Sequence, residues 1–371
     1  MSAHRTETLI IGAGPAGLAA GACLTKREAR FVIVEQSTAV GSSWRGHYDR
    51  VHLHTQRRHS ALPFLGFPPG TDRYPSRQQV IAYLEGYARH FRLNPRLGER
   101  VDNVSPDGGG WLTTTTAGTY RSRNVIVATG YNTVPCIPRW AGQERFRGRI
   151  LHSSQYRNAE PFRGQSVLVV GFGNSGGEIA IDLCEHGARV AMAVRGPVNI
   201  VPRDILGVPI LTLSLALSPL PARLADALAA PLLRVALGDI TSLGLRKPAV
   251  GPITQIRTTS RIPLVDVGTV RLIRQRRIEI LGDIRSLSDQ AVTFADGSVR
   301  HFDAIVAATG FRPGVERFLG ATGNTVLPRT ESRLAGASGV YLCGFCVTPT
   351  GMFREIGIEA RRIARHIAAT L

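Results

Sequence analysis

The stretch TLIIGAGPAGLAAGACL, residues 8–24, decides the fold class of this 371-residue chain. An apolar run leads into Gly12-x-Gly14-x-x-Gly17, a helical pattern follows, and the next apolar run, FVIVE, ends at Glu35. This order of strand, glycine turn, helix, strand and acid is typical of a Rossmann dinucleotide-binding unit. In such a unit the first glycine makes the turn, the second lets the backbone approach a pyrophosphate, and the third lets the helix pack closely on the strand.

These residues predict a dinucleotide site at the start of the helix. The free N–H groups and the dipole of a helix N-terminus favour the cofactor phosphates. Glu35 stands where a carboxylate accepts hydrogen bonds from ribose hydroxyl groups. The candidate contacts of this first site are Gly12, Gly14, Pro15, Ala16, Gly17, Glu35 and Gln36.

A second stretch, SVLVVGFGNSGGEIAIDL at residues 166–183, repeats the unit. The strand after it, RVAMAVRG, places Arg195 where the first unit has Glu35. A guanidinium group can bind a 2′-phosphate through paired hydrogen bonds, whereas a carboxylate would repel it. The second site is therefore predicted to prefer NADP over NAD. Its candidate contacts are Gly171, Gly173, Asn174, Ser175, Gly176, Arg195 and Arg203.

The repeat continues beyond the glycines. RNVIVATGYNTVP (123–135) and FDAIVAATGFRP (302–313) are apolar strands that break at Ala-Thr-Gly, and a β-rich stretch with turn signals precedes each. The chain is thus predicted to be α/β, with two Rossmann-like dinucleotide-binding domains of the three-layer ββα/αβ type, each with a β-meander insertion. Small residues at these strand ends let a dinucleotide approach closely, so Ala128, Thr129, Gly130, Ala308, Thr309 and Gly310 are further candidate contacts.

Two dinucleotide sites in one chain favour FAD paired with NADPH, where the nicotinamide delivers hydride to the flavin. Residues 1–145 and 311–371 are predicted to bind FAD, and residues 166–310 to bind NADPH. The NADPH domain is expected to carry an apolar helical insertion at about residues 203–240. Residues 146–165 are predicted to be the linker between the domains.

The linker contains FRGRILHSSQY, in which Phe146, Gly148, His152 and Tyr156 have the spacing F-x-G-x-x-x-H-x-x-x-Y. A chain that crosses between two such domains passes close to the place where nicotinamide meets flavin. We therefore expect the two aromatic residues to fix the domain orientation, and His152 to lie at the cofactors.

This spacing matches every fixed position of the fingerprint of the class B flavin-dependent monooxygenases, and ATGF at 308–311 matches the second marker of that family. The chain resembles in particular the plant YUCCA-type members, through stretches such as WRGHYDRVHLHT, VLVVGFGNSGGEIAIDLCEHGA and LGDITSLGLRKPAVGPI. The resemblance covers nearly the whole chain. It implies that NADPH reduces FAD, that oxygen forms a C4a-hydroperoxide on the reduced flavin, and that this species oxygenates a small substrate.

The resemblance also implies an active-site role for His54, which stands where many family members have asparagine. A neutral imidazole can donate one hydrogen bond and accept another, so it can do similar work. Gln56 replaces the proline of the YUCCA-type sequence L-H-L-P-K and supplies an amide nearby. Both are predicted to be catalytic. The other cofactor contacts expected on this ground are Trp44, Arg45, Val101 and Gly344.

The substrate that the resemblance favours is an indolic 2-oxo acid such as indole-3-pyruvate, which loses CO₂ on oxidation. N- or S-oxygenation of amines or sulfides is the alternative chemistry. Two further hypotheses remain: an NADPH-linked flavin reductase or oxidase with CGFC (343–346) as a relay, and a non-catalytic flavoprotein that binds a partner through residues 205–238.

Composition narrows the remaining classes. The net charge is +18, but the arginines are spread along the chain with few aromatics between them, which does not favour nucleic-acid binding. Five cysteines, an odd number and mostly scattered, do not suggest a disulfide framework, and no metal-ligand spacing occurs. The absence of an N-terminal apolar segment predicts a cytoplasmic protein. No transmembrane span is expected, because prolines interrupt the uncharged stretch 205–222. A homodimer is a separate hypothesis.

Overall fold

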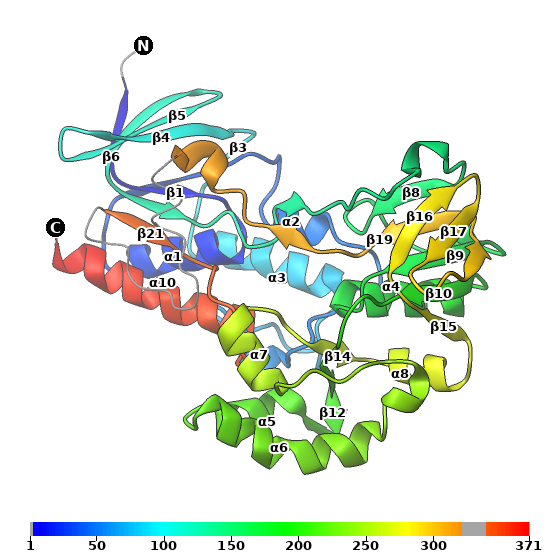
Figure 1. The fold of residues 1–371 in the computed structure, drawn as a ribbon. Helices are drawn as coiled ribbons and strands as arrows, with labels where there is room; N and C mark the ends of the chain where they lie inside the picture. The colour runs from blue at the N-terminus through cyan, green and yellow to red at the C-terminus, as the bar shows by residue number, and fades with distance from the viewer. Residues whose placement is uncertain (1–2, 321–338, 371) are drawn as a thin grey trace. The chain divides into compact units, whose positions relative to one another are not determined.

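The computed structural model of this chain describes residues 3–320 and 339–370 (Figure 1). The chain divides into two compact units. Unit 1 comprises residues 1–46, 55–134 and 312–371, and unit 2 comprises residues 47–54 and 135–311. Each unit is built on a parallel sheet with helices, which confirms the predicted fold class.

Unit 1 contains the first glycine motif between its first strand and helix. Its elements are β1 (His4–Ile11), α1 (Pro15–Thr25), β2 (Phe31–Glu35), α2 (Ser42–Arg45), α3 (Arg77–His90), β3 (Arg96–Leu97), β4 (Val101–Asp107), β5 (Gly110–Thr115), β6 (Gly118–Val127), β21 (Val340–Leu342) and α10 (Met352–Ala369). The seven strands form one sheet, in which β3, β2, β1, β6 and β21 are parallel.

The long strand β6 joins this parallel core to the predicted β-meander. Its second half lies between β1 and β21, with Ile126 opposite Ile10 and Tyr341. Its first half pairs antiparallel with β5, and β5 pairs antiparallel with β4. The burial of β6 alternates in the meander half and is continuous from Asn124 to Val127, because a parallel core strand is covered on both faces.

Unit 2 repeats the arrangement around the second glycine motif. Its main elements are β8 (Arg149–His152), β9 (Ser166–Val170), α4 (Asn174–Glu185), β10 (Arg189–Ala193), α8 (Thr269–Arg274), β15 (Ile278–Leu281), β16 (Ile284–Ser288), β17 (Ala291–Phe294), β18 (Val299–His301) and β19 (Ala304–Ala307). Five parallel strands run in the order β15-β10-β9-β19-β8. The second predicted meander is the antiparallel set β16-β17-β18.

An insertion separates β10 from α8 in unit 2. It consists of β11 (Ile200–Pro202), β12 (Asp204–Ile205), β13 (Val208–Pro209), α5 (Ile210–Leu217), α6 (Ala222–Leu237), α7 (Pro252–Thr259) and β14 (Leu264–Asp266). The predicted apolar helices correspond to α5 and α6, which Pro219 and Pro221 separate. Within the described residues, none of the helices has both the length and the apolar character needed to cross a membrane.

The division into units differs from the predicted one in two places. The sequence predicts a linker over 146–165, but β8 in this segment is the edge strand of the unit 2 sheet and pairs with β19. The boundary lies instead between Val134 and Pro135, where the short strand β7 (Val134–Pro135) occurs. Segment 47–54, predicted to lie in the first domain, groups with unit 2. Both differences depend on long-range contacts, which local sequence patterns do not encode.

Candidate functional site

The two glycine loops share one geometry at their first glycine. Gly12 has φ +106°, and a Cβ placed there would lie 2.7 Å from the carbonyl oxygen of Ala128. Gly171 has φ +110°, and its Cβ would lie 2.5 Å from the carbonyl oxygen of Ala308. Glycine alone avoids both the unfavourable φ and the collision. Each Ala-Thr-Gly segment therefore packs directly against the first glycine of its own loop.

The other glycines also have matching roles. A Cβ on Gly17 would lie 1.8 Å from the carbonyl oxygen of the first glycine of its loop, and one on Gly176 would lie 2.4 Å from the corresponding oxygen. The second glycines, Gly14 and Gly173, face open space and precede α1 and α4, whose first turns have no side-chain cap. The third glycine thus permits close packing, and the second leaves room and free N–H groups for a phosphate.

In unit 1 the Glu35 carboxylate is buried and fixed by its neighbours. Oε2 accepts a hydrogen bond from the backbone N–H of Ala13 at 2.7 Å. Oε1 accepts from the N–H of Ser37 at 3.0 Å and from the hydroxyl of Ser42 at 3.3 Å. An ionised carboxylate offers about four acceptor positions, so one remains for a ribose hydroxyl. Gln36, in contrast, is exposed.

In unit 2 the Arg195 side chain is exposed at the end of β10, and no ion pair in the described part of the chain involves it. Arg246, which sequence reasoning missed, donates from Nη2 to the carbonyl oxygen of Arg195 at 2.7 Å. Arg203 is less available because its Nε lies 3.4 Å from Oδ2 of Asp204. The exposed Arg195 guanidinium, with Arg246 beside its backbone, can therefore receive a phosphate.

The two Ala-Thr-Gly segments differ in how they use the threonine hydroxyl. Thr309 donates to the carbonyl oxygen of Cys136. The Thr129 hydroxyl oxygen is buried and has no hydrogen-bond partner in the described residues. Gly130 and Gly310 both have positive φ, near +89° and +85°, and both face open space. Thr129 is thus an unsatisfied polar group beside the first loop, as expected where a bound cofactor completes the site.

His152 connects the two sequence markers. Its ring is buried, Nε2 lies 3.1 Å from the carbonyl oxygen of Gly310, and Nδ1 lies 3.2 Å from the backbone N–H of Ser154. Nδ1 therefore accepts while Nε2–H donates, which is the neutral tautomer. Burial lowers the pKa of His152, although the hydrogen bond to Gly310 opposes this shift. The histidine holds the second Ala-Thr-Gly segment to the end of β8.

The other three fingerprint residues fasten the same segment within unit 2. Phe146 belongs to the apolar core of that unit, and a Cβ on Gly148 would lie 2.6 Å from both the Phe146 ring and the carbonyl oxygen of Asp303. The hydroxyl of Tyr156 donates to Oδ2 of Asp182 on α4 at 2.6 Å. Burial, the largest cause, raises the Tyr156 pKa. The fingerprint thus builds part of unit 2; the expectation that it fixes the domain orientation remains a prediction.

Segment 47–54, which we call the strap, is attached to α4. The hydroxyl of Tyr48 is hydrogen-bonded to Ser175, and burial raises the pKa of this tyrosine well above its usual value. Arg50 forms an ion pair with Glu185 near the end of the helix. The strap therefore spans α4 from its first turn, which carries the candidate phosphate contacts, to its last.

His54 forms the strap's third contact with α4. Its Nε2 lies 2.8 Å from Oε1 of Glu178, whose side chain is only 5% exposed. Sequence reasoning singled out His54 but missed Glu178, although a glutamate within the apolar helix run GGEIAIDL is the kind of signal that marks a buried, paired carboxylate. The structure thus assigns His54 a partner on the helix that follows the second glycine loop.

Gln56, the second predicted catalytic residue, lies in unit 1. The residue is only 6% exposed, and its amide oxygen has no hydrogen-bond partner within the described residues. Its backbone carbonyl accepts a hydrogen bond from the Ser60 hydroxyl at 2.9 Å, which fixes the turn that follows. A buried, unsatisfied amide oxygen is suited to accept a hydrogen bond from a bound group.

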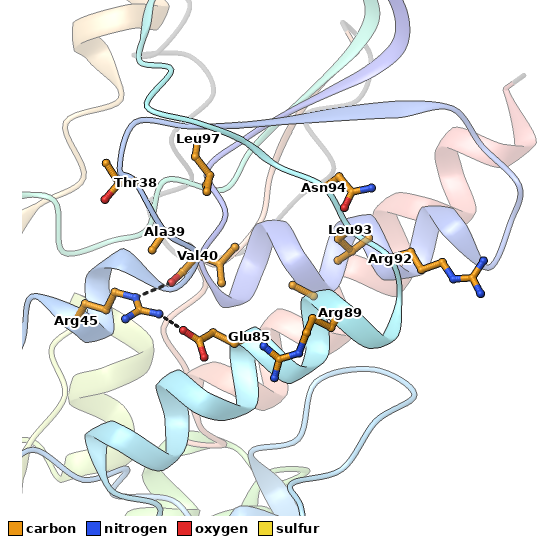
Figure 2. Close-up of a pocket in the computed structure, with 11 residues that line it drawn as sticks. Thr38, Ala39, Val40, Arg45, Glu85, Arg89, Arg92, Leu93, Asn94 and Leu97 are labelled. Carbon is orange, nitrogen blue, oxygen red and sulfur yellow. Dashed lines mark hydrogen bonds and ion pairs between the residues drawn. The ribbon is translucent and has the colours of Figure 1, made fainter.

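The loop after Glu35 is held mainly by protein contacts. Trp44 packs edge-on against Phe353 with ring centres 6.0 Å apart. Figure 2 shows Arg45 pointing toward Glu85 and the carbonyl oxygen of Val40, in a hollow of about 660 Å³. Arg45 is the one predicted cofactor contact among the residues that line this hollow, so the hollow is separate from the glycine loop. Val101 is half-buried at the start of β4.

The CGFC segment follows β21. Gly344 has φ +86°, a Cβ there would lie 2.9 Å from that of Ala16 on α1, and its N–H donates to Oε2 of the buried Glu359 at 2.6 Å. Cys343 is fully buried, and burial raises its pKa well above the usual value. Cys343 and Cys346 are both free thiols, and a buried thiol of raised pKa is poorly suited to relay electrons. Across the described ranges, no cluster of three or more His, Cys, Asp or Glu residues could hold a metal ion.

Comparison with known proteins decides the family. Residues 9–204, just over half of the chain, match the pyridine nucleotide-disulphide oxidoreductase family. The chain is 38% identical to the indole-3-pyruvate monooxygenase YUCCA1 of Oryza sativa subsp. japonica, over 91% of this chain and 86% of that protein. This chain belongs to the YUCCA-type flavin-dependent monooxygenases. YUCCA4 of the same plant is 37% identical over 98% of the chain and 87% of its own length. The monooxygenase is an oxidoreductase that uses FAD and NADPH, as the sequence predicts.

Solved structures support the fold of this monooxygenase. A flavin-containing monooxygenase from Stenotrophomonas maltophilia aligns over 99% of both chains, with a TM-score of 0.73 and 24% identity. A cyclohexanone monooxygenase from Rhodococcus sp. Phi1 aligns with a TM-score of 0.76, over all of this chain and 85% of its own, at 18% identity. A bacillithiol disulfide reductase from Staphylococcus aureus aligns similarly, with a TM-score of 0.72, over 99% of both chains and at 19% identity. Because these proteins differ in chemistry, the shared fold alone does not define the reaction.

Proposed function

We propose that this monooxygenase converts an indolic 2-oxo acid, such as indole-3-pyruvate, into the corresponding acetic acid. The observation that carries the proposal is the identity of 37–38% to two rice proteins named indole-3-pyruvate monooxygenase, over more than nine tenths of the chain. In this reaction the 2-oxo acid, O₂, NADPH and a proton give the shortened acid, CO₂, NADP⁺ and water. The bound cofactors supply the hydride transfer and the activation of oxygen.

We assign FAD to unit 1 and NADPH to unit 2. Glu35 has one acceptor position left for a ribose hydroxyl, and the buried Thr129 hydroxyl lacks a partner in the described structure. Arg195 is exposed where a 2′-phosphate would lie, with Arg246 at its backbone. The open space at Gly14 and Gly173, each before an uncapped helix, fits a pyrophosphate in both loops. The residues present therefore suit both cofactors.

The remaining candidate residues are assigned to orientation and water exclusion. The buried Glu178 carboxylate lies 2.8 Å from Nε2 of His54 and restricts where the ring can lie, so the other edge of the imidazole can face a bound group. Gln56 offers a buried amide oxygen as an acceptor. His152 fixes the carbonyl of Gly310, and thereby the segment beside the second glycine loop. None of these groups needs to act as a nucleophile.

The test is to incubate the FAD-loaded enzyme with NADPH, oxygen and indole-3-pyruvate, and to measure NADPH consumed, CO₂ released and acid formed. We expect these three quantities to be equal, with little peroxide. An amine or sulfide oxygenated faster than the 2-oxo acid would replace this proposal with N- or S-oxygenation. NADPH consumption with stoichiometric peroxide and no product from either substrate class would identify a reductase or oxidase.

We also propose a cytoplasmic location and a homodimer. The five cysteines, all free in the structure, support a reducing compartment, and the homodimer is a proposal from the sequence alone. Light scattering of the purified holoenzyme tests the second proposal, because a mass near 40 kDa, that of one chain, would contradict a homodimer.

A further inference from the structure

The insertion of unit 2 presents an apolar helix face to solvent. We call this the α6 stripe; it consists of Leu224, Leu228, Leu232 and Val235, which are 48%, 54%, 46% and 87% exposed. Their spacing of four, four and three residues places them along one side of α6. The opposite side of the helix is buried, so α6 is apolar on both sides. A surface helix normally carries polar residues outward, and a contiguous apolar stripe marks an interaction site.

The stripe is carried by a well-fastened scaffold. Asp226, on the inner side of α6, accepts hydrogen bonds from the backbone N–H groups of Ile253 and Thr254 at 2.8 and 2.9 Å, which caps α7. Arg257 of α7 donates to the carbonyl oxygens of Leu220 and Ser218, at 3.0 and 2.8 Å, in the turn before α6. The stripe is therefore a stable surface of the folded unit.

A second apolar projection belongs to the same insertion. The turn between β12 and β13 holds Leu206 at φ +47° with its side chain fully exposed, and Val208 beside it is 53% exposed. A left-handed conformation is costly for leucine, so the turn accepts strain while it exposes an apolar side chain. Figure 1 shows β12, α5 and α6 at the same end of unit 2.

The charge of the insertion indicates what kind of surface the α6 stripe binds. From Arg203 to Ile262 the chain has seven basic residues and three acidic ones, so the insertion has a net charge of +4. All three acidic residues have partners. Asp204 is paired with Arg203 and Asp239 with Lys247, and Asp226 of α6 accepts a backbone hydrogen bond at the start of α7. Arg223 and Arg234 on α6 are exposed, and no ion pair within the described ranges involves either. An apolar stripe beside unpaired arginines matches an anionic surface.

We propose that the α6 stripe docks this enzyme on the surface of a bilayer that contains anionic lipid. The leucines and valine enter the boundary between headgroups and acyl chains, and Arg223 and Arg234 contact the headgroups. A second copy of the chain would bring the same two arginines to the contact, and their mutual repulsion opposes pairing through this face. This peripheral attachment needs no membrane-spanning helix and does not depend on the proposed substrate.

The test is sedimentation of the FAD-loaded enzyme with vesicles of mixed phosphatidylglycerol and phosphatidylcholine, or of phosphatidylcholine alone. We expect binding to the mixed vesicles only, weaker in high salt. The double variant Leu228→Asp, Val235→Asp should reduce the bound fraction by about tenfold or more. Arg223→Gln and Arg234→Gln should each weaken binding by about fivefold. The matched control Val299→Asp changes an apolar residue of β18 that is 48% exposed, and should bind as the parent does.

Flavin content and NADPH oxidation without vesicles verify that each variant is folded. Equal binding to both vesicle types, or no binding to either, would overturn the proposal. If the protein did not bind vesicles and formed a dimer that Leu228→Asp dissociates, the stripe would instead be the contact between two copies of the chain.

Discussion

The two glycine loops of this enzyme have nearly the same backbone structure, but the strands that follow them end in side chains of opposite charge. In both, the first glycine has φ near +106° or +110° and packs against an alanine carbonyl, while the third contacts the first. The strand after each loop ends differently, with buried Glu35 in unit 1 and exposed Arg195 in unit 2. Under the proposed assignment, the backbone makes a generic pyrophosphate site, and one side chain per unit selects the rest of the dinucleotide.

The helices after the loops differ in a second way. Helix α1 consists mostly of small apolar residues and carries no charged side chain. Helix α4 carries three carboxylates, Glu178, Asp182 and Glu185, which bind His54, Tyr156 and Arg50 respectively. The helix of unit 2 therefore anchors other segments of the chain through charged side chains, whereas the helix of unit 1 has none.

The largest effect is expected from breaking each loop in turn. Gly17→Ala places a Cβ 1.8 Å from a carbonyl oxygen, so α1 must shift, and we expect a loss of about 1–3 kcal/mol in the free energy of unfolding together with loss of FAD. Gly176→Ala should instead abolish NADPH binding and retain FAD. Flavin absorbance after gel filtration and NADPH titration measure the two effects.

The control for this pair is Gly14→Ala, which meets no atom within 4 Å. It should leave unfolding almost unchanged and still weaken FAD binding, because the added methyl group occupies the space assigned to the pyrophosphate. If Gly17→Ala and Gly176→Ala lost both cofactors equally, the assignment of one cofactor to each unit would fail.

A smaller effect is expected from His54→Ala. The substitution leaves the buried Glu178 carboxylate without its partner, which should cost about 1–3 kcal/mol of unfolding free energy. We expect FAD to stay bound and peroxide release to rise relative to product, as measured by a peroxide assay beside product analysis. Arg50→Ala removes the more exposed ion pair of the strap, so it should change the free energy of unfolding and the ratio of peroxide to product little. An unchanged ratio of peroxide to product in His54→Ala would mean that this residue has no part in the mechanism.

The smallest effect concerns pH. Because burial lowers the pKa of His152 below that of an unfolded histidine, near 6.5, the unfolded chain binds more protons in acid. The stability that neutral His152 contributes is present above about pH 6.5 and is lost as the pH falls toward the folded-state pKa. Melting temperatures of the parent and of His152→Gln should therefore converge between pH 8 and pH 5. A constant difference would mean that His152 does not titrate as described.

Sequence predicted the repeated parts of this molecule well. Both glycine loops, both meanders and both Ala-Thr-Gly strands carry short-range patterns, since their glycines and alternating residues lie within a few positions of one another. Sequence missed what depends on distant partners. β8 becomes an edge strand only through β19, about 155 residues later, and the strap joins unit 2 through α4 and through Arg157 and Asn158, which lie more than 100 residues away in the sequence. Arg246 and Glu178 were missed for the same reason, because their partners lie far away in the sequence.

The coenzyme preference of Arg195→Glu tests the central claim most directly, because it gives unit 2 the acid of unit 1. The ratio of kcat/KM for NADPH to that for NADH is measured by anaerobic bleaching of the bound flavin. The parent enzyme should favour NADPH, and the variant should reverse or abolish the preference, by about a hundredfold in the ratio, with FAD content unchanged. An unchanged ratio in the variant would contradict the claim that this one charge distinguishes the two loops.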